Sequence, residues 1–320
     1  MKRYTAQLAA CLPRVAPEFD FVLFDRGENF GLDEQWRLPR EIRKARADLA
    51  HFTSLYAPLF PPRPYVITIH DLIHLRYPQF FKRRVGPYYR TAVRLVASRA
   101  ARVITDDTRT VVDLQRFLGV PRERCSVVPL GVDQQYLQVH TKYRGALPYF
   151  LYVGNHRAHK NLRTLFEAWH SLGDERAADL YVTGPDDFEG SLVEYQTARR
   201  QIVCLGEVPA ARMPALYAGA VALVHPALCE GFGLPMLEAM AARTCVIASE
   251  SSAPMVLQSG MLLFPPTDAA ALRARMLKVL TDEGLRSALV SEGRRIAERL
   301  TWEACARATA DVYREILEQC

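Results

Sequence analysis

The chain has 320 residues, 49% of them hydrophobic and 24% charged, which is ordinary for a globular protein and long enough for two domains. The net charge of +6 is unevenly distributed, since residues 1–145 carry +10 and the rest −4. The basic first part favours an anionic partner such as a membrane surface or a lipid phosphate, whereas no motif supports binding to nucleic acid. No apolar stretch has the length of a membrane span, and seven cysteines without a C-x-x-C pair argue against a disulfide framework or a zinc site, so we expect a cytoplasmic protein.

The amino-terminal half alternates short apolar runs with helical patterns, as a parallel-sheet domain does. We expect a helix over 4–12 and strands over 21–24, 50–52, 65–69 and 103–105. A dinucleotide-type domain normally opens with a strand and a glycine-rich turn, and neither precedes the first helix here. The sequence therefore predicts an α/β domain that lacks its opening strand.

His70-Asp71-Leu72 directly follows the strand predicted over 65–69. Residues at the carboxyl end of a parallel strand point toward the ligand crevice, so His70 is a candidate site residue and His74 a weaker one. A lone histidine is also a common structural residue, and position alone leaves both interpretations open. Asp106 and Asp107 follow the next strand, but two adjacent acids without a third ligand are weak evidence for a metal.

A basic helical region is predicted over 80–101. It carries Lys82, Arg83, Arg84, Arg90, Arg94 and Arg99, followed by Arg102, with Tyr88 and Tyr89 among them. Such a pattern fits a solvated helix face as well as it fits a patch that binds an acceptor or a membrane surface. Both interpretations stay open at this point.

The second half predicts another parallel sheet. The expected strands are 149–153, 180–183, 202–205, 221–225, 245–248 and 261–264, and the expected helices include 210–218, 236–242, 269–280, 285–300 and 302–317. Arg157 and Lys160 stand just before a further helix that ends near 172. Cations oppose the dipole at a helix amino terminus, so these two are expected to face an anion unless they are merely solvated.

The stretch 221–249 reads as strand, glycine-bearing loop, helix and strand. Gly231 and Gly233 flank Phe232, and Pro235 suits the first helical turn. Backbone N–H groups at such a helix start form an anion site. On their own, Glu230 and Glu238 would be an ordinary loop acid and an ordinary first-turn acid.

The string Glu230-Gly-Phe-Gly-Leu-Pro-Met-Leu-Glu238-Ala-Met-Ala closely resembles the E-x7-E segment of the family-4 retaining glycosyltransferases. The His70-Asp-Leu and Lys160-Asn-Leu segments resemble the same family, and the resemblance is firm over about 54–317. It implies the α/β GT-B fold, with two Rossmann-like doubly wound parallel-sheet domains facing across a cleft. The implied parts are an acceptor-binding domain over 1–138, a nucleotide-sugar-binding domain over 139–301 and a terminal helix over 302–320 that returns to the first domain.

The resemblance also implies a role for each site residue. His70 lies at the reaction centre, Glu230 bonds the transferred sugar, and Glu238 bonds the ribose. The basic pair Arg157 and Lys160 neutralises the diphosphate, although Arg157 is the looser match because the family often has arginine at the place of His159. Backbone groups hold sugar and phosphate oxygens at Gly231, Phe232, Gly233 and Leu234, and the base near Leu205.

The expected activity is metal-independent, retaining transfer of a hexose without a cofactor. Mannose from GDP-mannose is the preferred donor, from resemblance to bacterial polysaccharide mannosyltransferases, and UDP- and ADP-sugars are alternatives. The acceptor is a glycan or a polyprenyl-lipid-linked glycan, and the basic first domain suggests peripheral association with an anionic inner membrane face. The missing opening strand and glycine-rich loop favour an alternative, a catalytically silent nucleotide-binding partner. A phosphorylase would need a cofactor lysine segment that the sequence does not contain.

Overall fold

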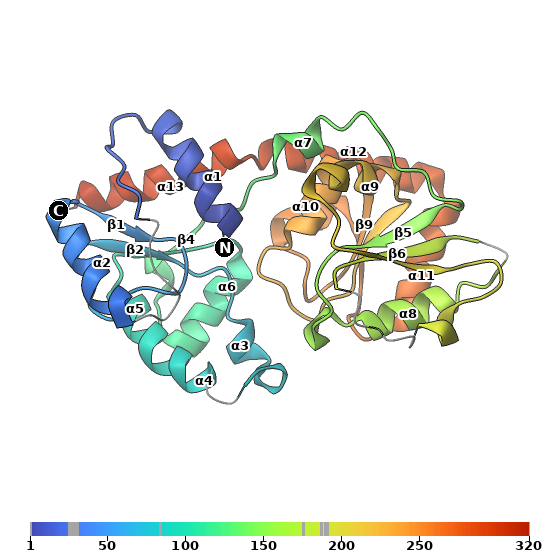
Figure 1. Cartoon of the computed structure of the whole chain (residues 1–320), viewed down its shortest axis with the longest axis horizontal. Coiled ribbons are helices and arrows are strands. Elements are labelled where there is room, and N and C mark those ends of the chain that lie inside the picture. Colours follow the sequence, from blue (N-terminus) through green and yellow to red (C-terminus); the bar gives the residue numbers. More distant parts are fainter. Residues whose placement is uncertain are drawn as a thin grey trace. The chain divides into compact units, whose positions relative to one another are not determined.

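The computed structural model describes residues 2–24, 32–82, 85–174, 177–185, 188 and 192–319. The chain divides into two compact units, each built around its own parallel sheet (Figure 1). Unit 1 consists of Met1–Gly131 together with Thr301–Cys320, and unit 2 is Val132–Leu300. Within the described ranges no helix has both the length and the apolar character that crossing a membrane requires.

The described residues of unit 1 form four strands and several helices. Its elements are α1 (Lys2–Val15), α2 (Leu32–Lys44), β1 (Ala50–Phe52), β2 (Tyr65–Thr68), α3 (Ile73–Arg76), η1 (Pro78–Phe80), α4 (Val85–Tyr88), η2 (Tyr89–Val93), α5 (Arg94–Arg99), β3 (Arg102–Thr105), α6 (Thr108–Asp113), η3 (Leu114–Leu118), η4 (Arg122–Arg124), β4 (Cys125–Val127) and α13 (Trp302–Leu317).

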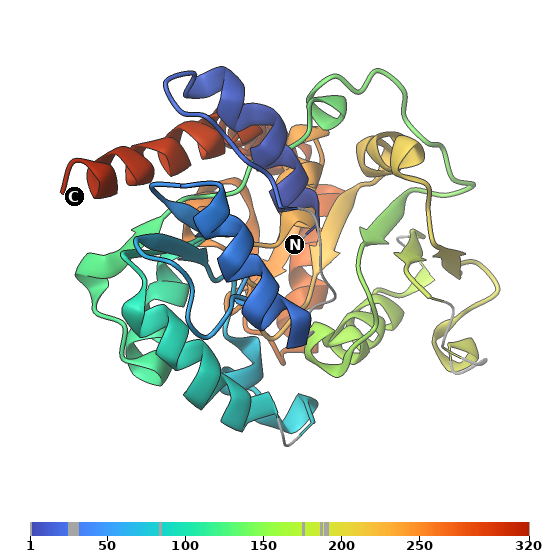
Figure 2. The ribbon, with the colours of Figure 1, turned by 60° about the vertical axis from the view of Figure 1, so that its left-hand side comes forward.

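The sheet of unit 1 is parallel, with the strands side by side in chain order, β1-β2-β3-β4. All four residues of β2 are buried, as expected of a central strand with both faces covered. The core on one face packs α2, α5 and η3 against the sheet. On the other face α1 lies beside α13, which Figures 1 and 2 both show. The last helix of the chain therefore belongs to the first unit.

One expectation for unit 1 is wrong. The stretch 21–24 is apolar but forms no strand; Val22 and Leu23 are 59% and 66% exposed. The region 80–101 is helical over most of its described residues, as expected, and runs through η1, α4, the π-helical η2 and α5. Two members of the predicted basic patch, Arg83 and Arg84, lie outside the described residues.

In the described part of unit 2 there are six strands. Its elements are α7 (Gln134–Leu137), β5 (Tyr149–Tyr152), η5 (Ala158–Lys160), α8 (Leu162–His170), β6 (Asp179–Thr183), η7 (Val193–Tyr195), β7 (Ile202–Gly206), η8 (Ala210–Arg212), α9 (Met213–Gly219), β8 (Ala222–His225), α10 (Leu234–Ala241), β9 (Cys245–Ser249), η9 (Met255–Gly260), β10 (Leu262–Phe264), α11 (Ala269–Thr281) and α12 (Glu283–Arg299).

The strand order of unit 2 positions its site. The sheet is parallel, in the order β10-β9-β8-β5-β6-β7, which is the Rossmann order. Helices α8 and α11 pack together on one face, and α10 packs with α9 and α12 on the other (Figure 1). The order reverses between β5 and β8, and we call this place the switch point. Ligands bind at the carboxyl ends of the strands at such a point.

Candidate functional site

Two loops meet at the switch point of unit 2. One follows β5 and leads through η5 to α8, and the other follows β8 and leads to α10. The Leu228 N–H donates to the His159 carbonyl at 2.8 Å, and the Asn161 side-chain amide donates to the Pro226 carbonyl at 3.1 Å. Because these bonds join the loops, side chains seventy positions apart in the sequence become neighbours.

The neighbours are Lys160, Glu230 and His225, which we call the carboxylate cluster. The Lys160 ammonium forms an ion pair with Glu230 Oε2, and His225 Nε2 donates to the same oxygen at 3.2 Å. The side chains of Lys160, Glu230 and His225 are 10%, 20% and 1% exposed. Two of the predicted site residues thus lie together, with a histidine that the motif analysis did not select.

The charge of Glu230 is set by opposing effects. Burial of the carboxylate acts to raise its pKa, but the hydrogen bond from His225 and the positive charge of Lys160 outweigh burial and lower the pKa to about 2. Glu230 is therefore ionised at any ordinary working pH. An ionised, partly buried carboxylate of this kind is suited to accept hydrogen bonds from sugar hydroxyls.

The loop after Glu230 leads into α10 through Gly233. Gly233 caps the helix with φ 74°, in the left-handed region, and a Cβ there would come within 2.1 Å of Met236 Cε. Gly231, Phe232 and Gly233 are buried, while Leu234 is partly exposed. Pro235 lies in the first turn, as expected. The amino end of α10 thus presents N–H groups that have no intrahelical partner.

Glu238 lies one turn further along α10. Its carboxylate is 5% exposed and accepts a hydrogen bond from the Tyr217 hydroxyl at 2.8 Å. Tyr217 is fully buried on α9, and its carbonyl accepts from Thr244 Oγ1 at 2.6 Å. Tyr217 therefore fixes the orientation of Glu238.

Two predicted residues of unit 2 lie outside these hydrogen bonds. Leu205 is partly buried near the end of β7, where the Gly184 N–H donates to the Gly206 carbonyl at 3.0 Å. Arg157 is exposed just before η5. In the described residues, neither side chain takes part in the hydrogen bonds or ion pairs of the carboxylate cluster.

His70 lies in unit 1, at the carboxyl end of β2. Its Nδ1 bonds Asp106 Oδ2 at 2.7 Å, and Asp106 follows β3, the neighbouring strand. Because a carboxylate only accepts, this bond places a hydrogen on Nδ1. Among the described residues, His70 Nε2 and Asp106 Oδ1 are buried without a hydrogen-bond partner. Asp107 instead caps α6, accepting from the Arg109 N–H at 2.8 Å, so the two acids do not act as a pair.

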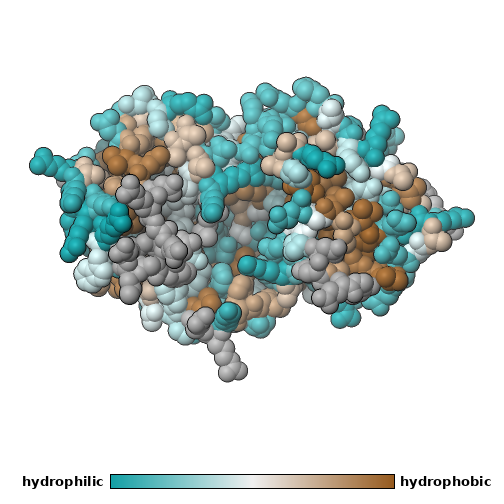
Figure 3. Space-filling model, viewed as in Figure 1, coloured by the Kyte–Doolittle hydropathy of each residue, from teal (hydrophilic) through white to brown (hydrophobic). Residues whose placement is uncertain are grey.

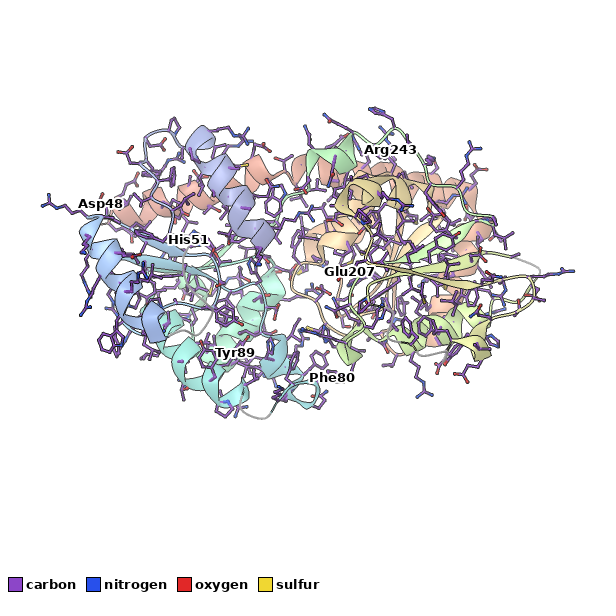
Figure 4. The ribbon with its side chains drawn as sticks, viewed as in Figure 1. Asp48, His51, Phe80, Tyr89, Glu207 and Arg243 are labelled. Carbon is purple, nitrogen blue, oxygen red and sulfur yellow. The ribbon has the colours of Figure 1, made fainter. Side chains whose placement is uncertain are left out.

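His51 on β1, labelled in Figure 4, belongs to a partly buried polar network. Its Nδ1 bonds the Tyr313 hydroxyl at 2.6 Å and its Nε2 bonds Thr68 Oγ1 at 2.7 Å. Burial, assisted by the nearby His70, lowers the pKa of His51 to about 3. Burial also raises the pKa of Asp106, and His70 opposes that effect. The network links β1 and β2 to α13.

Sequence reasoning missed His225, Tyr217 and the partnership of Asp106 with His70. A positional signal existed for two of them, since His225 ends β8 and Asp106 directly follows β3. Carboxyl ends of parallel strands were the places to inspect. Tyr217 had no signal, because its contact with Glu238 joins two different helices. In the described ranges no group of three or more His, Cys, Asp or Glu residues is placed to hold a metal ion.

Comparison with known proteins gives matches over most of the chain. Residues 5–136 match the family model described as Glycosyltransferase Family 4, and residues 147–282 match that described as Glycosyl transferases group 1. The O-antigen chain mannosyltransferase B of Escherichia coli is 29% identical over 289 residues, covering 85% of this chain and 76% of that protein. The O-antigen chain mannosyltransferase RfbU of Salmonella typhimurium is 30% identical over 211 residues, 64% of this chain and 58% of that protein. The structure of sucrose-phosphate synthase from Thermosynechococcus elongatus matches with a TM-score of 0.73 at 23% identity, covering 88% of this chain and 77% of that one.

Proposed function

This chain belongs to the family-4 glycosyltransferases and has their GT-B fold, and from that premise we propose that it transfers mannose from GDP-mannose, with retention, to a glycan or polyprenyl-lipid-linked acceptor. The names of the two bacterial relatives support mannose as the sugar. The observation that carries the proposal is the carboxylate cluster at the switch point, beside the amino end of α10. It supplies a cation for phosphate and an ionised acceptor for sugar hydroxyls.

Unit 2 is the proposed donor domain. Lys160 and Arg157 neutralise the diphosphate, assisted by the backbone amides of the loop 231–234 and the positive end of the α10 dipole. Glu230 accepts from the hydroxyls of the sugar and Glu238 from those of the ribose, while backbone groups near Leu205 contact the base. Lys160 reaches a phosphate only by sharing or leaving Glu230, its present ion partner.

The proposed chemistry is mainly electrostatic. The bond from the sugar C1 to the diphosphate oxygen breaks, and a bond from the acceptor oxygen to C1 forms on the same face. The acceptor's proton passes to the departing diphosphate. Lys160, Arg157 and the helix N–H groups stabilise the charge that develops on the leaving group, so the proposal requires neither metal nor cofactor. His70 is proposed to act on the transferred sugar, with Nδ1 held by Asp106.

Thermal unfolding with GDP, UDP, ADP and their sugar conjugates tests the donor. A ligand at ~100 times its Kd adds about 2.7 kcal/mol, enough to raise the midpoint by several degrees. We expect GDP and GDP-mannose to give the shift, Glu238→Ala to lose it, and GDP-mannose to be turned over in the presence of EDTA. A rise in the unfolding midpoint with UDP or ADP compounds but not with GDP compounds would replace GDP-mannose as the proposed donor. Binding without turnover would instead support a nucleotide-binding partner.

Unit 1 is the proposed acceptor domain, working at the cytoplasmic face of an anionic membrane. On α2, Trp36 is 70% exposed, and its basic neighbours include the exposed Arg40 and Arg43. Phe60 is 68% exposed with the Arg99 guanidinium 5.6 Å from its ring centre. Aromatic and basic side chains together suit a headgroup layer. The face drawn in Figure 3 likewise mixes hydrophobic with hydrophilic residues.

Vesicle sedimentation tests the membrane proposal. Each basic residue near an anionic surface contributes about 1 kcal/mol, so Arg43→Glu should weaken binding to phosphatidylglycerol vesicles by roughly tenfold or more. Arg307→Glu, an exposed charge reversal on α13, is the matched control. Equal loss in both variants, or no binding by the wild type, would contradict the proposal.

A further inference from the structure

From the contacts of the carboxylate cluster we infer that His225 is a positioning residue for Glu230. Its Nε2–H holds the carboxylate in place for the donor sugar, and it does so independently of Lys160. The inference rests on the proposed function, because it assigns His225 a part in the same transfer. His225 belongs to none of the motifs that identify the family in this sequence.

The first step in the argument is placement. His225 is the last residue of β8, a strand buried at every position, and its neighbour in the sheet register is Ala248 of β9. Its side chain is 1% exposed. The backbone of a central strand is the most rigid support that the unit offers, whereas Glu230 lies on a loop and Lys160 ends the short helix η5. The imidazole is therefore the fixed member of the cluster.

The second step concerns Lys160. Its ammonium and His225 Nε2 share one oxygen, Glu230 Oε2. In the proposed reaction Lys160 turns its charge to the diphosphate, so its bond to Glu230 is weakened when the carboxylate has to hold the sugar. A hydrogen bond from His225 does not conflict with donor binding in this way. It restrains Oε2 and leaves Oε1 to accept from a sugar hydroxyl.

The third step concerns the tautomer. The carboxylate oxygen only accepts, so the hydrogen of the shared contact lies on His225 Nε2. In the described part of the chain, His225 Nδ1 is buried and has no hydrogen-bond partner. An N–H there would be a buried donor left unsatisfied, which is costly, whereas an unprotonated nitrogen is tolerated better. The site thus favours the tautomer that donates to Glu230.

The other groups that face Glu230 do not replace this contact. Tyr152 lies close enough for the Glu230 charge to add to burial in raising its pKa, but its hydroxyl donates to the Asn155 carbonyl at 2.6 Å. Among the described residues, Lys160 is the other charged group that lowers the pKa of Glu230. Removing the imidazole should therefore leave Lys160 as the described side chain that bonds the Glu230 carboxylate.

Two substitutions separate hydrogen bonding from packing. H225Q keeps an N–H donor near the position of Nε2, and H225F keeps a ring but has no nitrogen. In wild type and both variants, kcat and donor KM are measured with GDP-mannose, or with the donor that the unfolding panel selects. The pKa of the Glu230 carboxyl is measured by carbon NMR of protein labelled at glutamate, with E230Q to assign its signal. H225L replaces H225F if circular dichroism shows that the latter does not fold.

We expect H225F to lower kcat at least tenfold with donor KM within about twofold, and H225Q to stay near wild type. The pKa of Glu230 should rise from about 2 toward the ordinary 4.5 in H225F only. Equal behaviour of H225Q and H225F, a change in KM alone, or an unmoved Glu230 pKa would overturn the inference. If the wild type turns over no donor, the proposed function fails, and the NMR titration still decides whether His225 holds Glu230.

Discussion

His51 makes the stability of unit 1 depend on pH. The pKa of His51 is lowered from 6.5 to about 3 by burial and by the nearby His70. Since the folded pKa lies below the unfolded one, the unfolded state binds the proton first. The contribution that neutral His51 makes to the stability of unit 1 is therefore complete above pH 6.5 and is lost as the pH falls from 6.5 toward 3.

The magnitude follows from these two values. Between about pH 7.5 and about pH 5, the free energy of unfolding of unit 1 should fall by about 2 kcal/mol. This value depends mainly on the pKa of the histidine in the unfolded chain, because any folded-state pKa below about 4.5 gives nearly the same fall at pH 5. His51 is only partly buried by surface area, so solvent screening makes this an upper value. About 2 kcal/mol corresponds to a roughly thirty-fold change in the population of opened molecules.

Hydrogen exchange measured by mass spectrometry is the appropriate assay, because it reports each unit separately. Protection factors, corrected for the intrinsic effect of pH on exchange, should fall up to about thirty-fold in peptides covering β1, β2 and α13. In His51→Gln, which keeps polar atoms near Tyr313 and Thr68, most of this fall should disappear. Peptides from β8 in unit 2 are the internal control. An equal fall in wild type and variant would refute the reasoning.

Two further predictions concern the sites. Asp106→Asn should lower kcat by about ten- to a hundredfold with little change in donor affinity, because it weakens the bond that orients His70. The control Asp107→Asn, which still caps α6, should leave kcat near wild type. Equal losses of kcat in the two variants would contradict the assignment. Gly233→Ala should destabilise unit 2 by more than about 1 kcal/mol and weaken nucleotide binding, since both φ and Met236 oppose a Cβ. Gly173→Ala, with φ 78° and open space around it, should show the backbone cost alone in the same thermal melts.

Much of the fold could be read from the sequence, because a strand buried on both faces is a continuous apolar run. The expected strands over 202–205 and 245–248 are β7 and β9, and the expected helix over 302–317 is α13. The stretch 21–24 failed because an apolar run shows only that burial would be favourable. It does not show that a neighbouring strand is there to pair with, and Val22 and Leu23 remain exposed.

Part of the candidate site could be selected from the sequence because its residues lie in one local segment. The loop from Glu230 to Leu234 and the start of α10 are such a segment. The partners were not predictable, because each pairing joins different elements: Lys160 with Glu230, Tyr217 with Glu238, and Asp106 with His70. Such contacts depend on strand order, which a single sequence does not reveal. The assigned roles of these residues remain predictions until the variants are measured.

The discontinuity of unit 1 has a consequence for biosynthesis. Unit 1 needs α13, but about 170 residues of unit 2 are translated between Gly131 and Thr301. At roughly 5–20 residues per second, the first unit waits roughly 10 to 30 seconds on the ribosome for its last helix. Unit 2 is contiguous, so it can fold as soon as it emerges. During that interval the apolar side of α1, with Tyr4, Leu8 and Leu12, lacks its partner and is open to chaperones, so the part of the protein that is made first is completed last.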